Sequence, residues 1–237
     1  MGGYPSNFFM SAGKEHDMDK IMEFLPFMLE GTVLTVELFI LTLAIALPLG
    51  LPVALGSNSR INPLSWLCKV FVWIFRGTPL LLQLFFFYFF FPIVLDIRLD
   101  VFFTVVLTYV LNYAAYFSEI YRGGINSIDK GQYEAAHALG ISKGQTMKDI
   151  ILPQTMKAVL PPTVNETANL VKDTALASTL PVVDLMKAAN SAVNRLTDIT
   201  PFIFAAIIYF IMTLVVTLIA GRIEKYFSRY DEKGEDK

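Results

Sequence analysis

The sequence predicts an all-α membrane protein with five transmembrane helices, its N-terminus outside and its C-terminus in the cytoplasm. The chain of 237 residues is 54% hydrophobic and 17% charged, with 20 phenylalanines. This composition is typical of a membrane protein with several spans rather than of a soluble domain. Apolar stretches long enough to cross a bilayer recur along the chain. Basic residues gather in the connections on one side of those stretches, which sets the orientation.

The first span is expected at residues 31–55, where apolar residues are nearly continuous. Pro48 and Pro52 fall near its end, where a kink is tolerated. The first twenty residues lack a basic start followed by an apolar core, so we expect no cleavable signal peptide there. Residues 1–23 are expected to be an exposed, partly disordered extracytoplasmic tail before a transmembrane region of residues 24–227.

The second span is expected at residues 66–95 and begins with two tryptophans suited to a membrane interface. Gly77, Thr78 and Pro79 interrupt it, so a kink is expected at this point. A short polar turn then separates it from a third span at residues 101–121. This third span leads into the most polar part of the chain.

The fourth span is expected at residues 157–186 and is unusually rich in polar side chains. Residues 187–198 are expected to form a loop. The fifth span, residues 201–226, is again strongly apolar and precedes a charged cytoplasmic tail at residues 228–237.

The distribution of Lys and Arg orients these spans, because basic residues concentrate in short cytoplasmic connections. The richer side carries Arg60, Lys69, Arg76, Arg122, Lys130, Lys143, Lys148, Lys157, Arg222, Lys225, Arg229, Lys233 and Lys237. The other side has Lys14, Lys20, Arg98, Lys187 and Arg195. The long polar connection between the third and fourth spans therefore lies in the cytoplasm.

That connection, residues 131–153, is predicted to be two short helices joined by a turn. Apart from Gly140 and Gly144 its residues are compatible with helix, and its bulky apolar residues are too few for a core element. Gly140 suits a left-handed residue that ends the first helix. Pro153 suits the first turn of the following helix. Two adjacent alanines offer a face that another protein can approach closely, so the segment is predicted to be an interaction surface.

The same segment carries a recognisable spacing: EAA, three residues, G, nine residues, I, one residue, LP. It resembles the cytoplasmic loop signature of permease subunits of bacterial ATP-binding-cassette importers of type I. Three further stretches resemble the polar amino-acid subfamily, whose substrates include histidine, glutamine, arginine and cystine: FRGTPLLLQLFFFYF from Phe75, SEIYRGGINSI from Ser118 and NETANLVKDTAL from Asn165. The resemblance implies a coupling helix that sits in a groove of the ATPase. It assigns this contact to Glu134, Ala135, Ala136, Gly140, Ile150, Leu152 and Pro153.

The resemblance also implies the partners and the location. It implies two ATPase subunits, a second permease that is identical or homologous, an extracytoplasmic substrate-binding protein and an amino-acid substrate, all at the bacterial cytoplasmic membrane. ATP and Mg²⁺ would be held by the ATPase, and no cofactor by this chain.

The chain itself has no motif for chemical catalysis. It lacks the phosphate-binding pattern GxxxxGK[ST] and the activated-serine pattern GxSxG. His16 and His137 are too isolated for a metal site, and Cys68, the single cysteine, excludes an internal disulfide. A net charge of −2 gives no reason to expect nucleic acid. A transport protein that lacks an ATP-hydrolysing domain needs a separate ATPase subunit. We therefore expect this chain to have no enzymatic activity.

Polar side chains inside the fourth span are candidates for the substrate pathway, because ionisable groups in a membrane face a partner or a cavity. Glu166, Asn169 and Asp173 follow one helical stripe, with Lys172 and Asn165 beside it. Both signs of charge suit a zwitterionic amino acid, and Glu166 is the favoured ligand-facing carboxylate. Charge pairing within the bundle explains the same pattern, and both interpretations stay open.

On the third span Asn112, Tyr116 and Glu119 share a face. Asn112 is deep enough to line a pathway, whereas Glu119 is expected to pair with Arg122 or Arg76 at a gate. The alternative function is a secondary transporter driven by an ion gradient. Five spans and the lack of an internal inverted repeat disfavour it.

Overall fold

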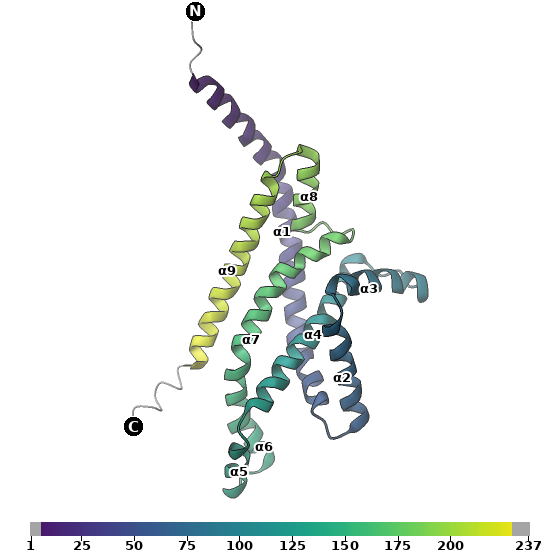
Figure 1. Ribbon diagram of the computed structural model, residues 1–237, viewed down its shortest axis with the longest axis vertical. Helices are drawn as coiled ribbons and strands as arrows, with labels where there is room; N and C mark the ends of the chain where they lie inside the picture. Colours follow the sequence, from purple (N-terminus) through teal and green to yellow (C-terminus); the bar gives the residue numbers. More distant parts are fainter. Residues whose placement is uncertain (1–5, 229–237) are drawn as a thin grey trace, which may run out of the picture.

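The computed structural model describes the backbone of residues 6–228 and the side chains of residues 23–226. Within this part of the chain every regular element is helical (Figure 1). The α-helices are α1 (Ser6–Ser57), α2 (Asn62–Gly77), α3 (Leu80–Val94), α4 (Val101–Ser127), α5 (Lys130–Ala138), α6 (Lys143–Gln145), α7 (Leu152–Asp173), α8 (Leu185–Leu196) and α9 (Thr200–Ser228). A π-helical segment, Thr146–Ile151, precedes α7, and a 3₁₀ segment, Thr174–Thr179, follows it.

Three helical stretches in the described part of the chain are long and apolar enough to cross a bilayer. They are Glu23–Ser57 in α1, Val101–Ser127 in α4 and Thr200–Tyr226 in α9. Together α2 and α3 make a fourth candidate if this bent pair counts as one span. The all-helical membrane fold predicted from composition is therefore present.

The second predicted span is broken rather than kinked. α2 and α3 meet at 109° across the two residues that separate them. Thr78 and Pro79 both have extended backbone angles, so the helical hydrogen-bond ladder stops between the two helices. Figure 1 shows α3 leaving the body of the molecule while α2 runs beside α4. The sequence located the interruption correctly but predicted too small a change of direction.

The core is built around α4, which packs along α1 and against α2, α3 and α7. Its largest fully buried side chains are Tyr109, Tyr113 and Phe117. Gly50 of α1 allows close approach, since a Cβ at this position would lie 2.9 Å from the Cβ of Phe117. Small residues at such crossings are favoured in membranes, where helices associate mainly through close packing and hydrogen bonds.

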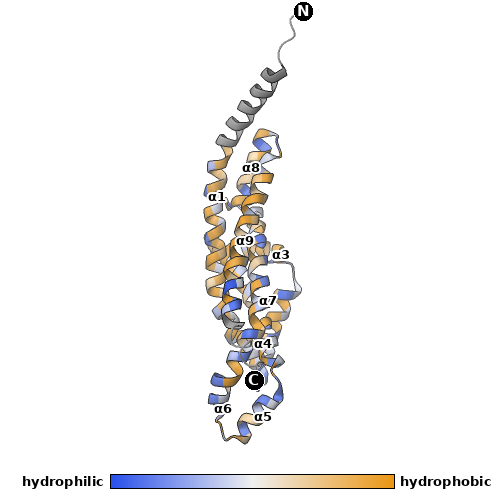
Figure 2. Cartoon of the chain, turned by 90° about the vertical axis from the view of Figure 1, so that its left-hand side faces the viewer, coloured by the Kyte–Doolittle hydropathy of each residue, from blue (hydrophilic) through white to orange (hydrophobic). Residues whose placement is uncertain are grey.

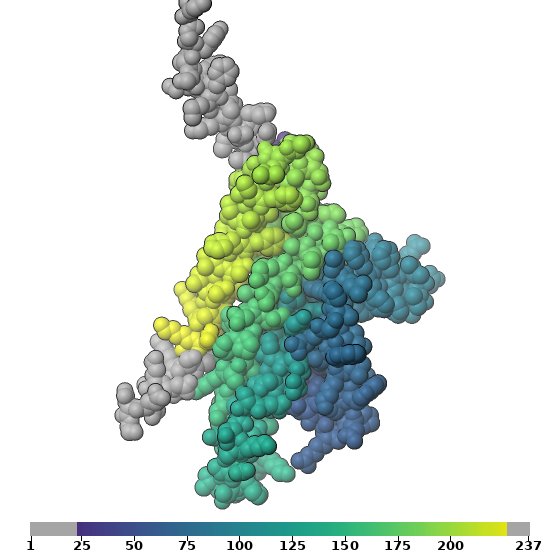
Figure 3. Space-filling model, viewed as in Figure 1, coloured from purple at the N-terminus to yellow at the C-terminus, as the bar shows by residue number. Residues whose placement is uncertain are grey.

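In contrast, α9 lies on the outside of the bundle. Large apolar side chains such as Phe210, Leu214 and Leu218 are exposed along it. Figure 3 shows α9 as a continuous flank of the molecule, packed against α7. An exposed apolar helix of this length suits contact with lipid.

The region after α7 differs from the prediction. The expected fourth span, residues 157–186, is not one helix, because α7 ends at Asp173 and gives way to the 3₁₀ segment and a turn. The expected loop at residues 187–198 is instead mostly α8. Asp184 caps this helix, with its Oδ1 accepting a hydrogen bond from Lys187 N at 2.9 Å. α8 ends at the left-handed Thr197.

Burial explains why α8 forms. Leu185, Ala188, Ala189 and Ala192 lie on its buried face and pack in one cluster with Phe24 and Met28 of α1 and Ala205 of α9. The polar residues between them resemble a loop in sequence, whereas packing selects the helix.

The N-terminal prediction also needs correction. α1 begins at Ser6, so the expectation of a partly disordered tail is wrong for residues 6–23. Residues 1–5 and the charged tail from residue 229 lie outside the described residues.

Candidate functional site

The predicted interaction surface projects from the end of α4 and α7 opposite α8 (Figure 1). Asp129 caps the N-terminus of α5, with its Oδ1 accepting a hydrogen bond from Gly131 N at 2.6 Å. The helix ends in a Schellman motif: Ile141 N donates to Ala136 O and Gly140 N donates to His137 O, each at 3.0 Å. Gly140 has φ +72°, the left-handed conformation predicted for it.

The second half of this segment is joined directly to α7. Ser142 and Gln145 form a capping box at the start of α6. From there the backbone stays helical through the π-helical segment into α7, where Pro153 occupies the first turn. The predicted arrangement of two short helices around a turn is confirmed, with the second helix continuous with a long one.

The seven loop residues named from the sequence divide into exposed and anchored positions. Glu134, Ala135, Gly140, Leu152 and Pro153 are exposed, Ile150 is half-buried and Ala136 is 2% exposed. Leu139 was not singled out from the sequence, yet it is 78% exposed at the tip of the turn. The sequence signal that could have identified it is a bulky apolar residue directly before the glycine predicted to be left-handed. Its exposure makes Leu139 a candidate contact with a partner protein.

A second feature is a cavity of about 730 Å³ between α2 and α4. Its lining combines three cations, one carboxylate and two aromatic side chains with smaller groups: Lys69, Val70, Val72, Trp73, Arg76, Gly77, Tyr116, Glu119 and Arg122. The cavity therefore carries an excess of positive charge.

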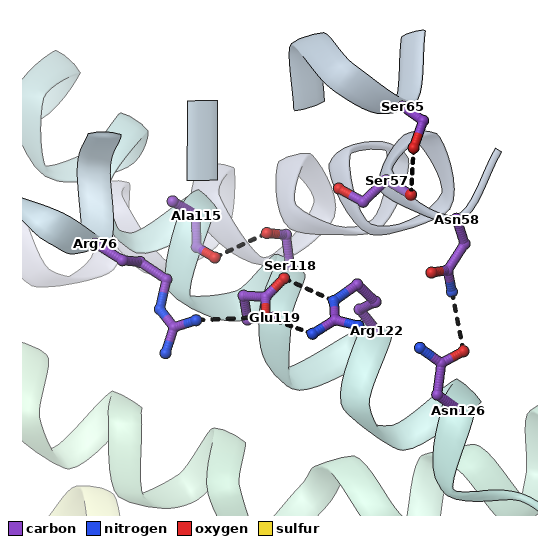
Figure 4. Close-up of polar contacts among 9 residues, drawn as sticks. All are labelled: Ser57, Asn58, Ser65, Arg76, Ala115, Ser118, Glu119, Arg122 and Asn126. Carbon is purple, nitrogen blue, oxygen red and sulfur yellow. Dashed lines mark hydrogen bonds and ion pairs between the residues drawn. The ribbon is translucent and has the colours of Figure 1, made fainter. Parts of the chain in front are cut away.

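Glu119 is shared by two arginines at this cavity (Figure 4). Arg122, on the next turn of α4, donates from Nε to Oε1 and from Nη2 to Oε2, both at 2.8 Å. Arg76 comes from the end of α2, with its Nη1 3.4 Å from Oε2 of Glu119. The Arg76 guanidinium also lies 5.2 Å from the ring centroid of Tyr116, a cation–π geometry. One carboxylate thus joins two helices and leaves one positive charge uncompensated.

Asn112 lies one turn before Tyr116 but does not reach the cavity. Its side chain is 4% exposed. Its Nδ2 donates to Phe75 O at 3.1 Å and to Oε1 of Gln83 at 2.9 Å. Of the three residues on this face of α4, Asn112 is therefore buried between helices, whereas Tyr116 and Glu119 line the cavity.

The polar stripe of α7 also splits between exposed and tethered residues. Asn165, Asn169 and Lys172 are exposed, whereas Glu166 is partly buried. Asp173 is tied to α4 and is also only partly exposed.

Two buried tyrosines of α4 make this tie. Tyr113 donates its hydroxyl to Oδ2 of Asp173 at 2.8 Å, and Tyr109 donates to the backbone oxygen of Asp173 at 2.6 Å. The sequence did not single out these tyrosines, because aromatic residues in an apolar span are typical of packing. Asp173 therefore has a structural partner within the bundle.

Comparisons with known proteins give a consistent result. The model of the family described as "Binding-protein-dependent transport system inner membrane component" matches residues 46–229. The arginine transport system permease protein ArtQ of Bacillus subtilis is 38% identical over 208 residues, covering 87% of this chain and 95% of that protein. A putative glutamine transport system permease protein GlnP of Rickettsia felis is 39% identical over 200 residues, covering 84% and 92%. A crystal structure of an amino acid ABC transporter with histidines superposes with a TM-score of 0.81 and 31% identity, covering 87% and 96%.

Proposed function

The chain belongs to the family of binding-protein-dependent transport system inner membrane components, and on that premise we propose that it imports a polar or charged amino acid. Its relatives are permease subunits of ATP-binding-cassette amino-acid importers. Such a subunit forms the translocation route in the inner membrane and leaves ATP hydrolysis to a separate subunit. The observation that carries the proposal is the EAA loop, which forms an exposed helix–turn–helix at one end of the bundle.

The proposed topology has five spans: α1, the α2–α3 pair, α4, α7 and α9. Figure 2 shows hydrophobic residues along α1 and hydrophilic residues on α5 and α6, which supports a place in the membrane for α1 and outside it for the loop. The excess of Lys and Arg near the α5–α6 end supports a cytoplasmic loop and C-terminus with the N-terminus outside. α7 is the most polar of these spans, which suits a helix that faces a pathway instead of lipid.

The loop is proposed to dock into an ATPase subunit through the seven residues named from the sequence, together with Leu139. Exposed Glu134 and Ala135 supply the approachable face, and the buried Ala136 holds it to the turn. Because the backbone remains helical from α6 through the π-helical segment into α7, a displacement of the docked loop shifts α7 directly. ATP-driven closure of two ATPase subunits would thereby move the polar stripe of this helix.

The translocation route is proposed to follow the cavity between α2 and α4 together with the polar stripe of α7. Its candidate residues are Asn112, Tyr116, Asn165, Glu166, Asn169, Lys172 and Asp173. Of these, Glu166 remains the favoured contact for a substrate amino or guanidinium group. The buried positions of Asn112 and the tether on Asp173 favour supporting roles for both. The Arg76–Glu119–Arg122 cluster is proposed to be a gate, because the Arg76–Glu119 ion pair joins α2 to α4 and Glu119 can exchange between the two arginines as the helices move.

The assembly is proposed to contain a second permease, identical or homologous, and two ATPases that hold ATP and Mg²⁺. An extracytoplasmic binding protein would meet the opposite end, near α8. Membrane lipid surrounds the bundle, and no nucleic-acid partner is proposed. No observation in the described part of the chain favours the ion-gradient alternative.

The test is reconstitution of the chain with its ATPase and binding protein in proteoliposomes, followed by titration with a panel of amino acids. We expect one amino acid, together with the binding protein, to stimulate ATP hydrolysis and to accumulate inside. Glu134→Lys should retain membrane insertion but lose the coupling of hydrolysis to uptake. Uptake that persists without ATP and follows an ion gradient would contradict the proposal.

A further inference from the structure

The break between α2 and α3 creates a hydrogen-bonding problem in an apolar environment. In an unbroken helix the carbonyl of Phe75 would accept the N–H group four residues later. That position is Pro79, which has no N–H group. Within a bilayer no water replaces the missing donor, so an unpaired carbonyl is strongly unfavourable.

Two side-chain amides supply the missing donor. Phe75 O accepts from Nε2 of Gln83 at 2.9 Å and from Nδ2 of Asn112 at 3.1 Å. Gln83 Nε2 also lies 3.1 Å from Thr78 O and 2.8 Å from Thr78 Oγ1. The two amides are joined as well, because Asn112 donates to Gln83 Oε1 at 2.9 Å. Gln83 comes from α3 and Asn112 from α4, so the contacts link three helices at one carbonyl.

Burial makes this arrangement specific. Gln83 is 6% exposed and Asn112 is 4% exposed. Asn112 uses both N–H bonds of its amide, one toward each partner, and Gln83 has acceptors for both of its own. Buried amides whose donors are all engaged hold their neighbours in one geometry, since movement would strand polar groups.

The position of the linked carbonyl connects this pair to the cavity. Phe75 directly precedes Arg76, and Asn112 lies one turn before Tyr116 and two before Glu119 on the same face of α4. Fixing the backbone of residue 75 against Asn112 therefore fixes where the next side chain enters the cavity. Arg76 is found there, over the Tyr116 ring and 3.4 Å from Glu119.

We propose that Gln83 and Asn112 are a positioning pair that replaces the backbone hydrogen bond lost at Pro79, holds the α2–α3 break and thereby places Arg76 in the cavity. The consequence for transport rests on the proposed function. The placement itself does not, and it can be measured separately.

The first experiment measures the geometry of the break. Cys68, the only cysteine, is replaced by serine, and spin labels are attached at Trp66→Cys on α2 and Phe89→Cys on α3, both exposed positions. Distances are recorded by double electron–electron resonance in nanodiscs, with labelled chains diluted by unlabelled ones. We expect one narrow distribution for the labelled parent and a broadened or shifted one for Gln83→Leu and Asn112→Leu.

A matched control separates this effect from general loss of a buried polar group. Thr108 is fully buried on α4, and its hydroxyl donates within its own helix, to Thr104 O at 2.8 Å. Thr108→Val should keep the parent distribution. Unchanged distributions in both leucine variants would overturn the proposal, whatever the protein transports.

The second experiment tests whether the pair acts through Arg76. In reconstituted transport we expect Gln83→Leu and Asn112→Leu each to lower the maximal rate about tenfold, and the double variant to be no slower, because either change opens the shared network. In an Arg76→Ala background the same substitutions should cause no additional loss. Losses that multiply in that background would overturn the positioning role. If the unsubstituted protein does not transport any amino acid, the proposed function is contradicted. The distance measurement then decides by itself whether Gln83 and Asn112 hold the break.

Discussion

Gly140 provides the sharpest test of the proposed docking by residues 131–153, because its conformation can be perturbed without a steric collision. It has φ +72°, and a Cβ added there would meet no atom within 4 Å. Gly140→Ala therefore costs only the strain of an L-residue in the left-handed region, about 1–2 kcal/mol. At 1.4 kcal/mol per tenfold change, this corresponds to a roughly 5- to 30-fold smaller population of the native turn.

Gly144 is the matched control, since it lies four residues away in the same loop and also has open space around its Cα. It is part of α6, where alanine is favoured over glycine by about 1 kcal/mol. The affinity of the ATPase for the chain in nanodiscs is the measurement. Gly140→Ala should weaken binding by up to about 30-fold and slow uptake, whereas Gly144→Ala should bind as the parent does. Equal affinities for the two variants would refute the assignment of the turn to docking.

Three further predictions concern the packing and the polar contacts. Tyr113→Phe removes the interhelical hydrogen bond to Asp173 and should lower stability by about 1 kcal/mol, measured by unfolding in detergent. Gly50→Leu should severely reduce the amount of folded protein, because a Cβ at position 50 would lie 2.9 Å from the Cβ of Phe117. The folded fraction is measured from size-exclusion profiles. Leu139→Asp should weaken ATPase binding at least tenfold by placing a charge at an apolar contact, measured by the same affinity assay.

Each of these predictions has its own control variant. Tyr121→Phe removes another hydroxyl of α4 that bonds a backbone carbonyl, Leu47 O at 3.2 Å, and leaves the Asp173 tether intact. Gly77→Leu adds bulk where no atom lies within 4 Å, so it should fold normally. Ala138→Asp adds a charge at the exposed neighbour of the turn. Stable Gly50→Leu protein would disprove the close crossing of α1 and α4, and normal binding by Leu139→Asp would remove that residue from the docking surface.

Local signals account for the parts of the fold that were predicted correctly. Continuous apolar stretches identify the spans because burial in lipid depends on composition along a short segment. Gly140 and Pro153 identify the turn and the start of α7 because their backbone restrictions operate within a few residues. The interruption after Gly77 was visible for the same reason, although its 109° angle was not.

The features that were missed depend on contacts between distant segments. α8 forms on a surface supplied by α1 and α9. Its alternation of alanine with polar residues does not by itself predict a helix. Spacing placed Asn112 on the face shared with Tyr116 and Glu119, but only the approach of α3 shows that Gln83 covers it. The tether of Asp173 by two tyrosines is equally invisible along the chain.

The sequence by itself determined the membrane class, the family resemblance and the helix–turn–helix form of residues 131–153, since each depends on residues that are close together in the chain. The tertiary structure alone decided which polar groups face the cavity and which support the helices. A helical face is set by spacing within one helix, whereas its environment is set by whichever helix packs against it. In this protein the proline that breaks α2 from α3 creates an unmet hydrogen bond, and residues from two other places in the chain satisfy it.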